Sequence, residues 1–182
     1  MTEEPPARLA KLRPIQQADL PELKRFWWDP EAIGEHDWFG FRMSSALDFE
    51  RRWHEDGLTG EESSFLAVET DEGACAGWVT WHVLPTGNVE IGIALLPAHR
   101  RAGIGTDAQR RLVHHLFGTT PVHRIQARTD VDNTAEQKAL ERVGFRREGV
   151  QRGAAFRGGR WRDGVMYGLL RDDLPAAQRD HS

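Results

Sequence analysis

The chain has only one cysteine and one tyrosine, and it has no long hydrophobic run. Cys75 has no second cysteine to pair with, and its apolar neighbours predict a thiol buried in a strand rather than a nucleophile. No apolar segment reaches the length of a membrane span, and the first residues do not resemble a secretory signal. We therefore expect a cytoplasmic protein with no membrane partner.

Positive charge is also scarce. The chain has 24 lysines and arginines but 28 aspartates and glutamates, so its formal net charge is -4. A protein that holds a phosphate backbone needs a basic surface, so we expect no nucleic-acid partner. The eight histidines form no His-Glu-x-x-His pattern, and a single cysteine forms no pair. The sequence therefore predicts no metal site.

The length of 182 residues predicts one domain, over residues 11–175, with flexible ends at 1–10 and 176–182. Alternating apolar residues predict strands, and apolar residues three and four apart predict helices. Strands are expected at 12–15, 64–69, 74–82, 89–95, 122–129, 145–157 and 160–170, and helices at 19–28, from about 45, after 105 and at 133–143. Asp19 is the predicted N-cap of the first helix. This order predicts an α/β (α+β) fold, a mixed sheet with helices on its faces.

Residues 100–106, Arg-Arg-Ala-Gly-Ile-Gly-Thr, lie between a predicted strand and a predicted helix. The first N–H groups of a helix have no intrahelical partner, and the helix dipole adds partial positive charge there. Gly103 and Gly105 remove side chains that would hold a phosphate away from the backbone. The loop lacks the Lys-Ser/Thr ending of a P-loop, and Ala108 replaces the third glycine of a dinucleotide-binding loop. The sequence therefore predicts a diphosphate site.

The Arg-x-x-Gly-x-Gly spacing of residues 100–105 resembles the pyrophosphate loop of the GNAT superfamily of N-acetyltransferases, which bind acetyl-coenzyme A. Pro97 and the Asn-Thr-Ala segment at 133–135, which opens a helix that ends in Gly-Phe, carry the same resemblance. Residues 145–170 are similar to the branch that includes the RimJ and RimL ribosomal-protein N-terminal acetyltransferases. The resemblance implies the GNAT fold, a mixed, largely antiparallel twisted sheet flanked by helices, with a strand–phosphate loop–helix cofactor site.

Acetyl-coenzyme A is the cofactor that this resemblance implies. In the resembled family, a backbone N–H near the end of the strand before the loop meets the thioester carbonyl, and the amine attacks directly in a ternary complex. The implied cofactor contacts are Ile93, Ala94 and Leu95 of the strand, Arg100, Arg101, Ala102, Gly103, Ile104, Gly105 and Thr106 of the loop, and Asn133.

Glu90 is the candidate catalytic residue, for deprotonating the attacking amine directly or through water. It shares a strand face with Gly92 and Ala94, whose small size leaves room for a substrate. The resembled family often has a carboxylate in this region. The alternative is an ion pair between Glu90 and an arginine of a neighbouring strand, and the sequence leaves both interpretations open.

The group that protonates the leaving thiolate has no evident counterpart. Many GNAT enzymes have a tyrosine where this chain has Leu140, and RimL-type enzymes often have a serine where it has Glu136. Glu136 with Asn133 fits a capping box instead. The only tyrosine, Tyr167, lies in the last predicted strand. Water is the remaining candidate for the proton donor.

The resemblance places the acceptor side of the cleft in the segment that holds Trp27, Trp28, Trp38, Phe39, Phe41 and Trp53. Trp38 is the predicted substrate contact, and the alternative for these aromatic residues is packing on the sheet or a dimer contact. Further predicted substrate contacts are His36, Asp37 and His82, with Glu35 beside them.

The sequence thus predicts an acetyl-coenzyme A-dependent N-acetyltransferase that acts on a primary amine. Two acceptor classes remain, the α-amine of a protein N-terminus and the amine of a small molecule such as an amino acid conjugate or an antibiotic. We expect a monomer or a homodimer. The alternative function is a non-catalytic acyl-coenzyme A-binding or regulatory protein, which the absence of the family's tyrosine and serine favours.

Overall fold

The computed structural model describes residues 11–28, 34, 36, 46–61 and 63–174. A seven-stranded sheet has the order β1-β2-β3-β4-β5-β7-β6. Its strands are β1 (Lys11–Pro14), β2 (Ser63–Glu69), β3 (Cys75–Val83), β4 (Val89–Leu95), β5 (Arg124–Asp130), β6 (Arg146–Arg157) and β7 (Arg160–Leu170). All neighbours are antiparallel except β4 and β5. The predicted mixed, largely antiparallel sheet and the predicted order of elements are therefore confirmed.

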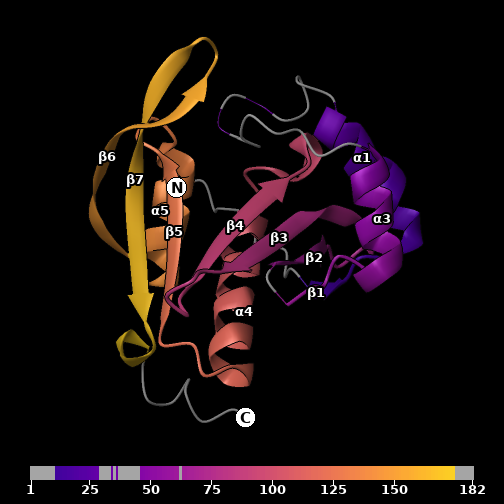
Figure 1. Ribbon diagram of the computed structural model, residues 1–182, viewed down its shortest axis with the longest axis horizontal. Coiled ribbons are helices and arrows are strands. Elements are labelled where there is room, and N and C mark those ends of the chain that lie inside the picture. Colours follow the sequence, from indigo (N-terminus) through magenta and orange to yellow (C-terminus); the bar gives the residue numbers. More distant parts are fainter. Residues whose placement is uncertain (1–10, 29–33, 35, 37–45, 62, 175–182) are drawn as a thin grey trace, which may run out of the picture.

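Helices cover both faces of the sheet (Figure 1). The first pair is α1 (Leu20–Trp28) and α3 (Ala46–Asp56), and the second is α4 (Ile104–Thr119) and α5 (Thr134–Val143). Short 3-10 turns span Gln17–Asp19, Pro97–His99 and Arg171–Asp173. Within the described ranges, no helix combines the length and the apolar character that a membrane crossing needs.

Strand β4 lies between two hydrophobic cores, and its successive side chains point alternately into one and the other. Val89 and Ile91 are buried against α4 and α5, and Ile93 and Leu95 pack on the same core. Ala94 points the other way, into the core that α1 and α3 form with β2 and β3. The predicted grouping of the four larger residues on one face of this strand is confirmed. The opposite face carries the small or polar residues Glu90, Gly92 and Ala94.

Two residues differ from their predicted environments. Asp19 ends a short turn before α1, and its carboxylate points back to accept from the Gln16 N–H at 2.8 Å instead of capping the helix ahead of it. Cys75 is half-buried rather than buried, and its Sγ lies 3.5 Å from the Gly77 carbonyl oxygen. Burial raises the pKa of the Cys75 thiol, so it remains protonated at neutral pH.

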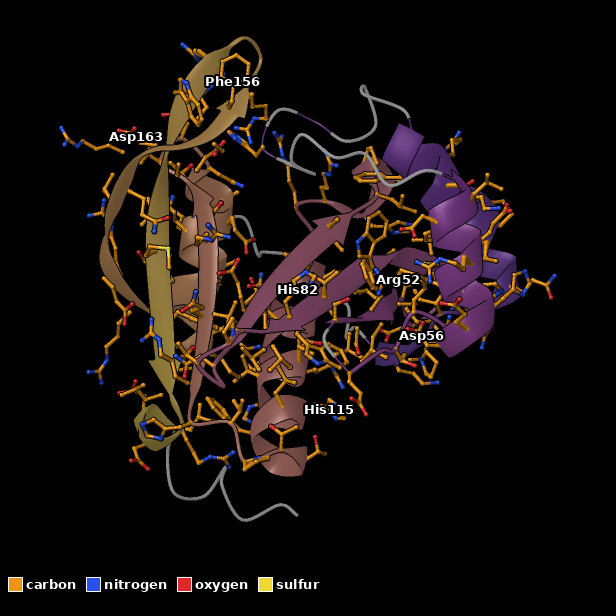
Figure 2. The ribbon with its side chains drawn as sticks, viewed as in Figure 1. Arg52, Asp56, His82, His115, Phe156 and Asp163 are labelled. Atoms are coloured by element: carbon orange, nitrogen blue, oxygen red, sulfur yellow. The ribbon has the colours of Figure 1, made fainter. Side chains whose placement is uncertain are left out.

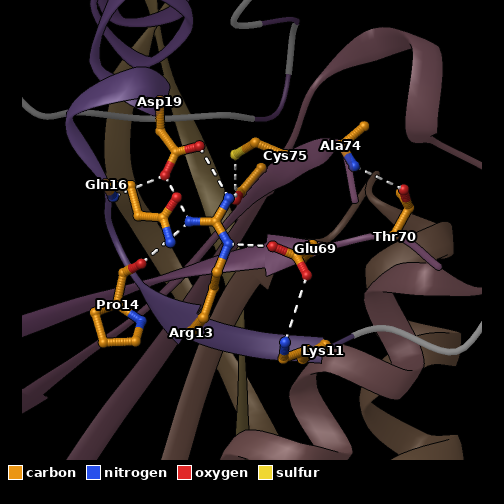
Figure 3. A network of polar contacts seen from close by, with 10 residues as sticks. Lys11, Arg13, Pro14, Gln16, Asp19, Glu69, Thr70, Ala74 and Cys75 are labelled. Carbon is orange, nitrogen blue, oxygen red and sulfur yellow. Dashed lines mark hydrogen bonds and ion pairs between the residues drawn. The ribbon is translucent and has the colours of Figure 1, made fainter. Parts of the chain in front are cut away.

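A charged network ties β1 and β2 to the start of α1 (Figure 3). The Arg13 guanidinium donates to both carboxylate oxygens of Asp19, at 2.7 and 3.0 Å, and to Glu69 on β2. Lys11 completes the network at 3.6 Å from Glu69. The Arg13 and Asp19 side chains are only 11% and 7% exposed, so neither charge is well solvated and each depends on the other.

Arg13→Met should lower the free energy of unfolding by about 3 kcal/mol, because it leaves the Asp19 carboxylate buried without its cation. Urea or thermal denaturation would measure the change. Lys11→Met is the matched control, since Lys11 is 70% exposed and its pair with Glu69 should contribute less than about 1 kcal/mol. Equal losses in the two variants would contradict the role of burial.

The Asp19 carboxyl also predicts how stability changes with pH. Burial opposes its ionisation, but the bonds from Arg13 and from the Gln16 N–H outweigh burial and hold the pKa of Asp19 below its ordinary value. Its contribution to the free energy of unfolding is complete above the pKa of about 4 that the carboxyl has in the unfolded chain. This contribution is lost as the pH falls through the lower pKa of the folded protein. Melting temperatures from pH 7 to pH 2 should therefore fall more steeply for the wild type than for Asp19→Asn.

Candidate active site

The parallel strands β4 and β5 pair at only three positions, from Val89 opposite Ile125 to Ile91 opposite Ala127. Beyond that point β4 continues beside β3 but leaves the side of β5 (Figure 1). The Leu96 N–H donates to the Ala76 carbonyl oxygen of β3 at 2.9 Å. Because successive peptide groups point to opposite strand edges, those at 93 and 95 face the edge where the pairing with β5 has ended.

The loop after β4 brings a helix N-terminus to the same end of the sheet. Arg101 and Gly103 have left-handed φ angles of 65° and 78°, and Gly103 is the N-cap residue of α4. The first helical bond runs from the Asp107 N–H to the Gly103 carbonyl oxygen at 3.2 Å. The N–H groups of residues 104–106 therefore precede the helical ladder and form the predicted type of anion site.

Charged side chains surround this N-terminus. The Arg100 Nε donates to the Leu95 carbonyl oxygen at 2.8 Å, so Arg100 links the loop to the end of β4. Asp107, in the first turn of α4, accepts from the Arg111 Nε at 2.8 Å and lies 3.7 Å from the Arg110 guanidinium. These two arginines offset a carboxylate that would otherwise repel a phosphate. The sequence analysis did not single out Asp107, although the i+3 and i+4 arginines are visible in the sequence.

Asn133 caps α5 beside the end of β5. Its Oδ1 accepts from the Glu136 N–H at 3.1 Å, while its own N–H donates to the Asp130 carbonyl oxygen at 3.1 Å. The Glu136 carboxylate accepts instead from the buried Gln109 of α4 at 3.3 Å. The reciprocal half of the predicted capping box is therefore wrong, because Glu136 links α5 to α4.

Glu90 lies in a row of register partners with His82 on β3 and Gln126 on β5. Its Oε2 accepts from the Gln126 Nε2 at 2.8 Å, and its Oε1 accepts from the Arg128 guanidinium at 2.7 Å. The ion pair with an arginine of a neighbouring strand, one of the two interpretations of Glu90, is thus present. A role for Glu90 as a base stays a prediction.

His82 lies next to Glu90 on the same face of the sheet, within reach of the charge on Arg52 of α3 (Figure 2). Burial lowers the pKa of the His82 imidazole; the negative charge of Glu90 opposes this shift, and the positive charge of Arg52 adds to it. The imidazole is therefore neutral at neutral pH and offers hydrogen bonds rather than charge.

Asp130, at the C-terminal end of β5, joins three segments that are far apart in the sequence. It forms an ion pair with Arg157 of β6 and lies 3.2 Å from the His36 Nδ1. Arg157 also donates to the His36 carbonyl oxygen at 3.0 Å. These contacts hold His36 at the end of β5. The predicted acceptor residues Trp38 and Asp37, and Glu35 beside them, lie outside the described residues.

Neither Leu140 nor Tyr167 can supply the proton for the leaving thiolate. Leu140 is buried in the core under α5. Tyr167 is fully buried on β7, and its hydroxyl donates to Glu141 at 3.1 Å. Burial, together with Glu141, raises the pKa of Tyr167. The phenol therefore serves the packing of α5 on the sheet.

The sequence predicts an arginine partner for Glu90 without identifying Arg128, and it predicts neither the bond from Gln126 nor the role of Asp130. A signal for them exists in β5, where Arg124, Gln126, Arg128 and Asp130 alternate with the buried Ile125 and Ala127 and with Thr129. That alternation marks one polar strand face. It does not say which residues of β4 or β6 the polar side chains meet.

Comparisons with known proteins agree with this geometry. A family profile described as an acetyltransferase (GNAT) domain matches residues 10–146. Uncharacterized N-acetyltransferase p20 of Bacillus licheniformis is 29% identical over 167 residues, which cover 88% of this chain and 92% of that protein.

Two solved structures share the fold. The spermidine N-acetyltransferase from Vibrio cholerae, in complex with CoA and spermine, has a TM-score of 0.79 at 20% identity and covers 90% of this chain and 96% of its own. RimJ of Mycobacterium smegmatis, in complex with CoA-disulfide, has a TM-score of 0.79 at 24% identity and covers 96% of this chain and 88% of its own.

The profile spans most of the chain, so the predicted GNAT fold is confirmed, and RimJ is among the solved structures that share it. The matched profile agrees with the separated end of β4 and with the glycine at the start of α4. The chain is therefore a member of the GNAT family, the acetyl-coenzyme A-dependent N-acetyltransferases.

Proposed function

We propose that this protein transfers an acetyl group from acetyl-coenzyme A to a primary amine, of a protein N-terminus or of a small molecule, by direct attack in a ternary complex. One observation carries the proposal: the end of the β4–β5 ladder lies next to a helix N-terminus whose first amides precede the helical ladder. The solved neighbours support it, since one is in complex with CoA and spermine and the other with CoA-disulfide.

The chain's own groups fit such a cofactor along its length. The N–H groups of residues 104–106 suit a pyrophosphate, and Gly103 leaves that approach without a side chain. The peptide groups of Ile93 and Leu95 face the edge that β5 has left, which suits the amides of a pantetheine arm. Asn133 uses its Oδ1 to cap α5, and its Nδ2 group remains a donor for the same arm.

Acetyl-coenzyme A, when bound, supplies an acyl thioester. The Leu95 N–H would donate to the thioester carbonyl oxygen as negative charge develops on it. Glu90 lies five residues before Leu95 on β4, about 16 Å away, so it would take the proton of the attacking amine through water, and the neutral His82 beside it would accept or donate a hydrogen bond to the acceptor. Solvent would protonate the leaving thiolate, because Tyr167, the chain's one tyrosine, is buried against Glu141.

The test is consumption of the acetyl-coenzyme A thioester with a panel of peptides, polyamines, amino acids and aminoglycosides. Turnover with at least one primary amine supports the proposal, and the preferred amine decides between the two acceptor classes. Coenzyme A binding without turnover on any amine would support the non-catalytic alternative instead.

Gly103→Val should abolish coenzyme A binding, with a loss in affinity of at least about a hundredfold. A β-branched residue disfavours the φ of 78° at this N-cap, and its side chain would stand over the amides of residues 104–106. Isothermal titration calorimetry with coenzyme A measures the effect. Gly118→Val, at the other end of α4, is the control and should bind like the wild type. Wild-type affinity in Gly103→Val would refute the assignment of the loop.

Glu90→Gln should lower kcat by about a hundredfold while leaving the Kd for coenzyme A unchanged, because it removes a proton acceptor and keeps the shape of the side chain. The pH dependence of kcat should change with it. Arg128→Gln removes the partner of Glu90 but not the carboxylate, so it should retain most of the activity. If both variants lose activity equally, the ion pair rather than the base explains the effect.

A further inference from the structure

The β6–β7 hairpin is strongly basic, although the whole chain is acidic. Residues 146–163 contain two carboxylates, Glu148 and Asp163, against six arginines, Arg146, Arg147, Arg152, Arg157, Arg160 and Arg162. Neither Arg152 nor Arg160 has an ion-pair partner within the described part of the chain. The half of the hairpin near its turn therefore presents positive charge that the rest of the described surface does not cancel.

This half of the hairpin borders the candidate active site. Arg157 reaches back to Asp130 at the end of β5, and Asp130 is the register partner of Gly164. Arg162 lies two residues before Gly164, on the strand face that also carries Glu90 and Gln126. Its guanidinium is 3.6 Å from Asp132, the residue before Asn133. Arg162 is thus beside the proposed cofactor arm, on the acceptor face.

Arg162 has hydrogen-bonding capacity that the described protein atoms do not use. Its Nε is buried and has no hydrogen-bond partner within the described part of the chain. Its one ion-pair partner, Asp132, is 66% exposed and too distant for a hydrogen bond. A buried donor without a partner costs stability, and a guanidinium fits a carboxylate with two parallel bonds. Such a side chain is suited to a carboxylate that arrives with a ligand.

The distance from Arg162 to the reacting end restricts the ligand. The proposed reacting end is at the Leu95 N–H, four residues beyond Ile91 on β4, and this is the level of Asp163, next to Arg162 on β7. Two strand spacings separate β4 from β7, a distance of at least about 10 Å. The carboxylate of a free α-amino acid lies much closer to its own amine. A carboxylate on the second or third residue of an extended peptide, at about 3.3 Å per residue, spans the distance.

We propose that Arg162 binds a carboxylate of the acceptor, and that the preferred acceptor is the α-amine of a peptide whose second or third residue is Asp or Glu. The inference rests on the proposed acetyl transfer and names its substrate class.

The test compares acetylation of two amidated tetrapeptides, Ala-Glu-Glu-Gly and Ala-Gln-Gln-Gly, with free glutamate as the small-molecule probe. The acidic peptide should have a kcat/KM at least about tenfold above that of the neutral peptide, through KM rather than kcat. Equal values for the two peptides would overturn the proposal. A preference for free glutamate over the acidic peptide would overturn the peptide length argued above.

Arg162→Gln should remove the preference by raising the KM for the acidic peptide at least about tenfold, with the neutral peptide unaffected. Arg162→Lys should restore part of the preference, which a purely structural role would not require. Arg146→Gln is the matched control, because it removes one arginine from the far end of the same hairpin, where Arg146 pairs with Asp173. A similar loss in the control would show that only net charge matters and would contradict the site.

Failure of the proposed function can be told apart from failure of this inference. If no amine is acetylated, calorimetric titration of the protein saturated with coenzyme A by the acidic peptide still tests Arg162. If the wild type binds the acidic peptide and Arg162→Gln does not, the carboxylate site is supported even without catalysis. If the wild type does not bind the peptide, the carboxylate site is overturned. If amines are acetylated without any preference for carboxylates, the acetyltransferase stands and the role of Arg162 does not.

Discussion

The short parallel ladder between β4 and β5 determines where the rest of the candidate active site lies. Two parallel neighbours need a crossover, and here the crossover is α4, which begins at the C-terminal end of β4. The helix N-terminus and the last peptide groups of β4 are therefore brought to the same end of the sheet by topology. Because the ladder stops after three residue pairs, the N–H and C=O groups of Ile93 and Leu95 have no partner among the described strands on the β5 side of β4.

The two cores hold this arrangement in place from both faces. Ile104, Ala108 and Leu112 of α4 pack on the same core as Val89 and Ile91, so α4 begins at the end of β4 through buried apolar contacts rather than through the loop. On the other face, α1 and α3 pack on β2, β3 and β4, while Gln126 and Arg128 of β5 are polar and bond to Glu90 of β4.

The sequence predicted the parts that depend on local pattern. The strand and helix periods, the glycine-containing loop before α4 and the Asn133 cap are local signals, and each is present in the structure. The end of the β4–β5 ladder could not be predicted, because both strands continue regularly past it. The contacts of Asp130 with His36 and Arg157 and of Glu136 with Gln109 depend on residues 27 to 94 positions apart, which only the packed fold brings together.

The two interpretations of Glu90 are compatible once exposure is considered. A fully buried ion pair would hold the carboxylate firmly and oppose its use as a base. The Arg128 side chain is 47% exposed, and an exposed pair of this kind contributes about 0–1 kcal/mol. Exchanging Arg128 for an incoming ammonium would therefore cost little, since one cation replaces another at the same carboxylate. The ion pair with Arg128 holds the Glu90 carboxylate on the face where the acceptor amine would arrive in the proposed reaction.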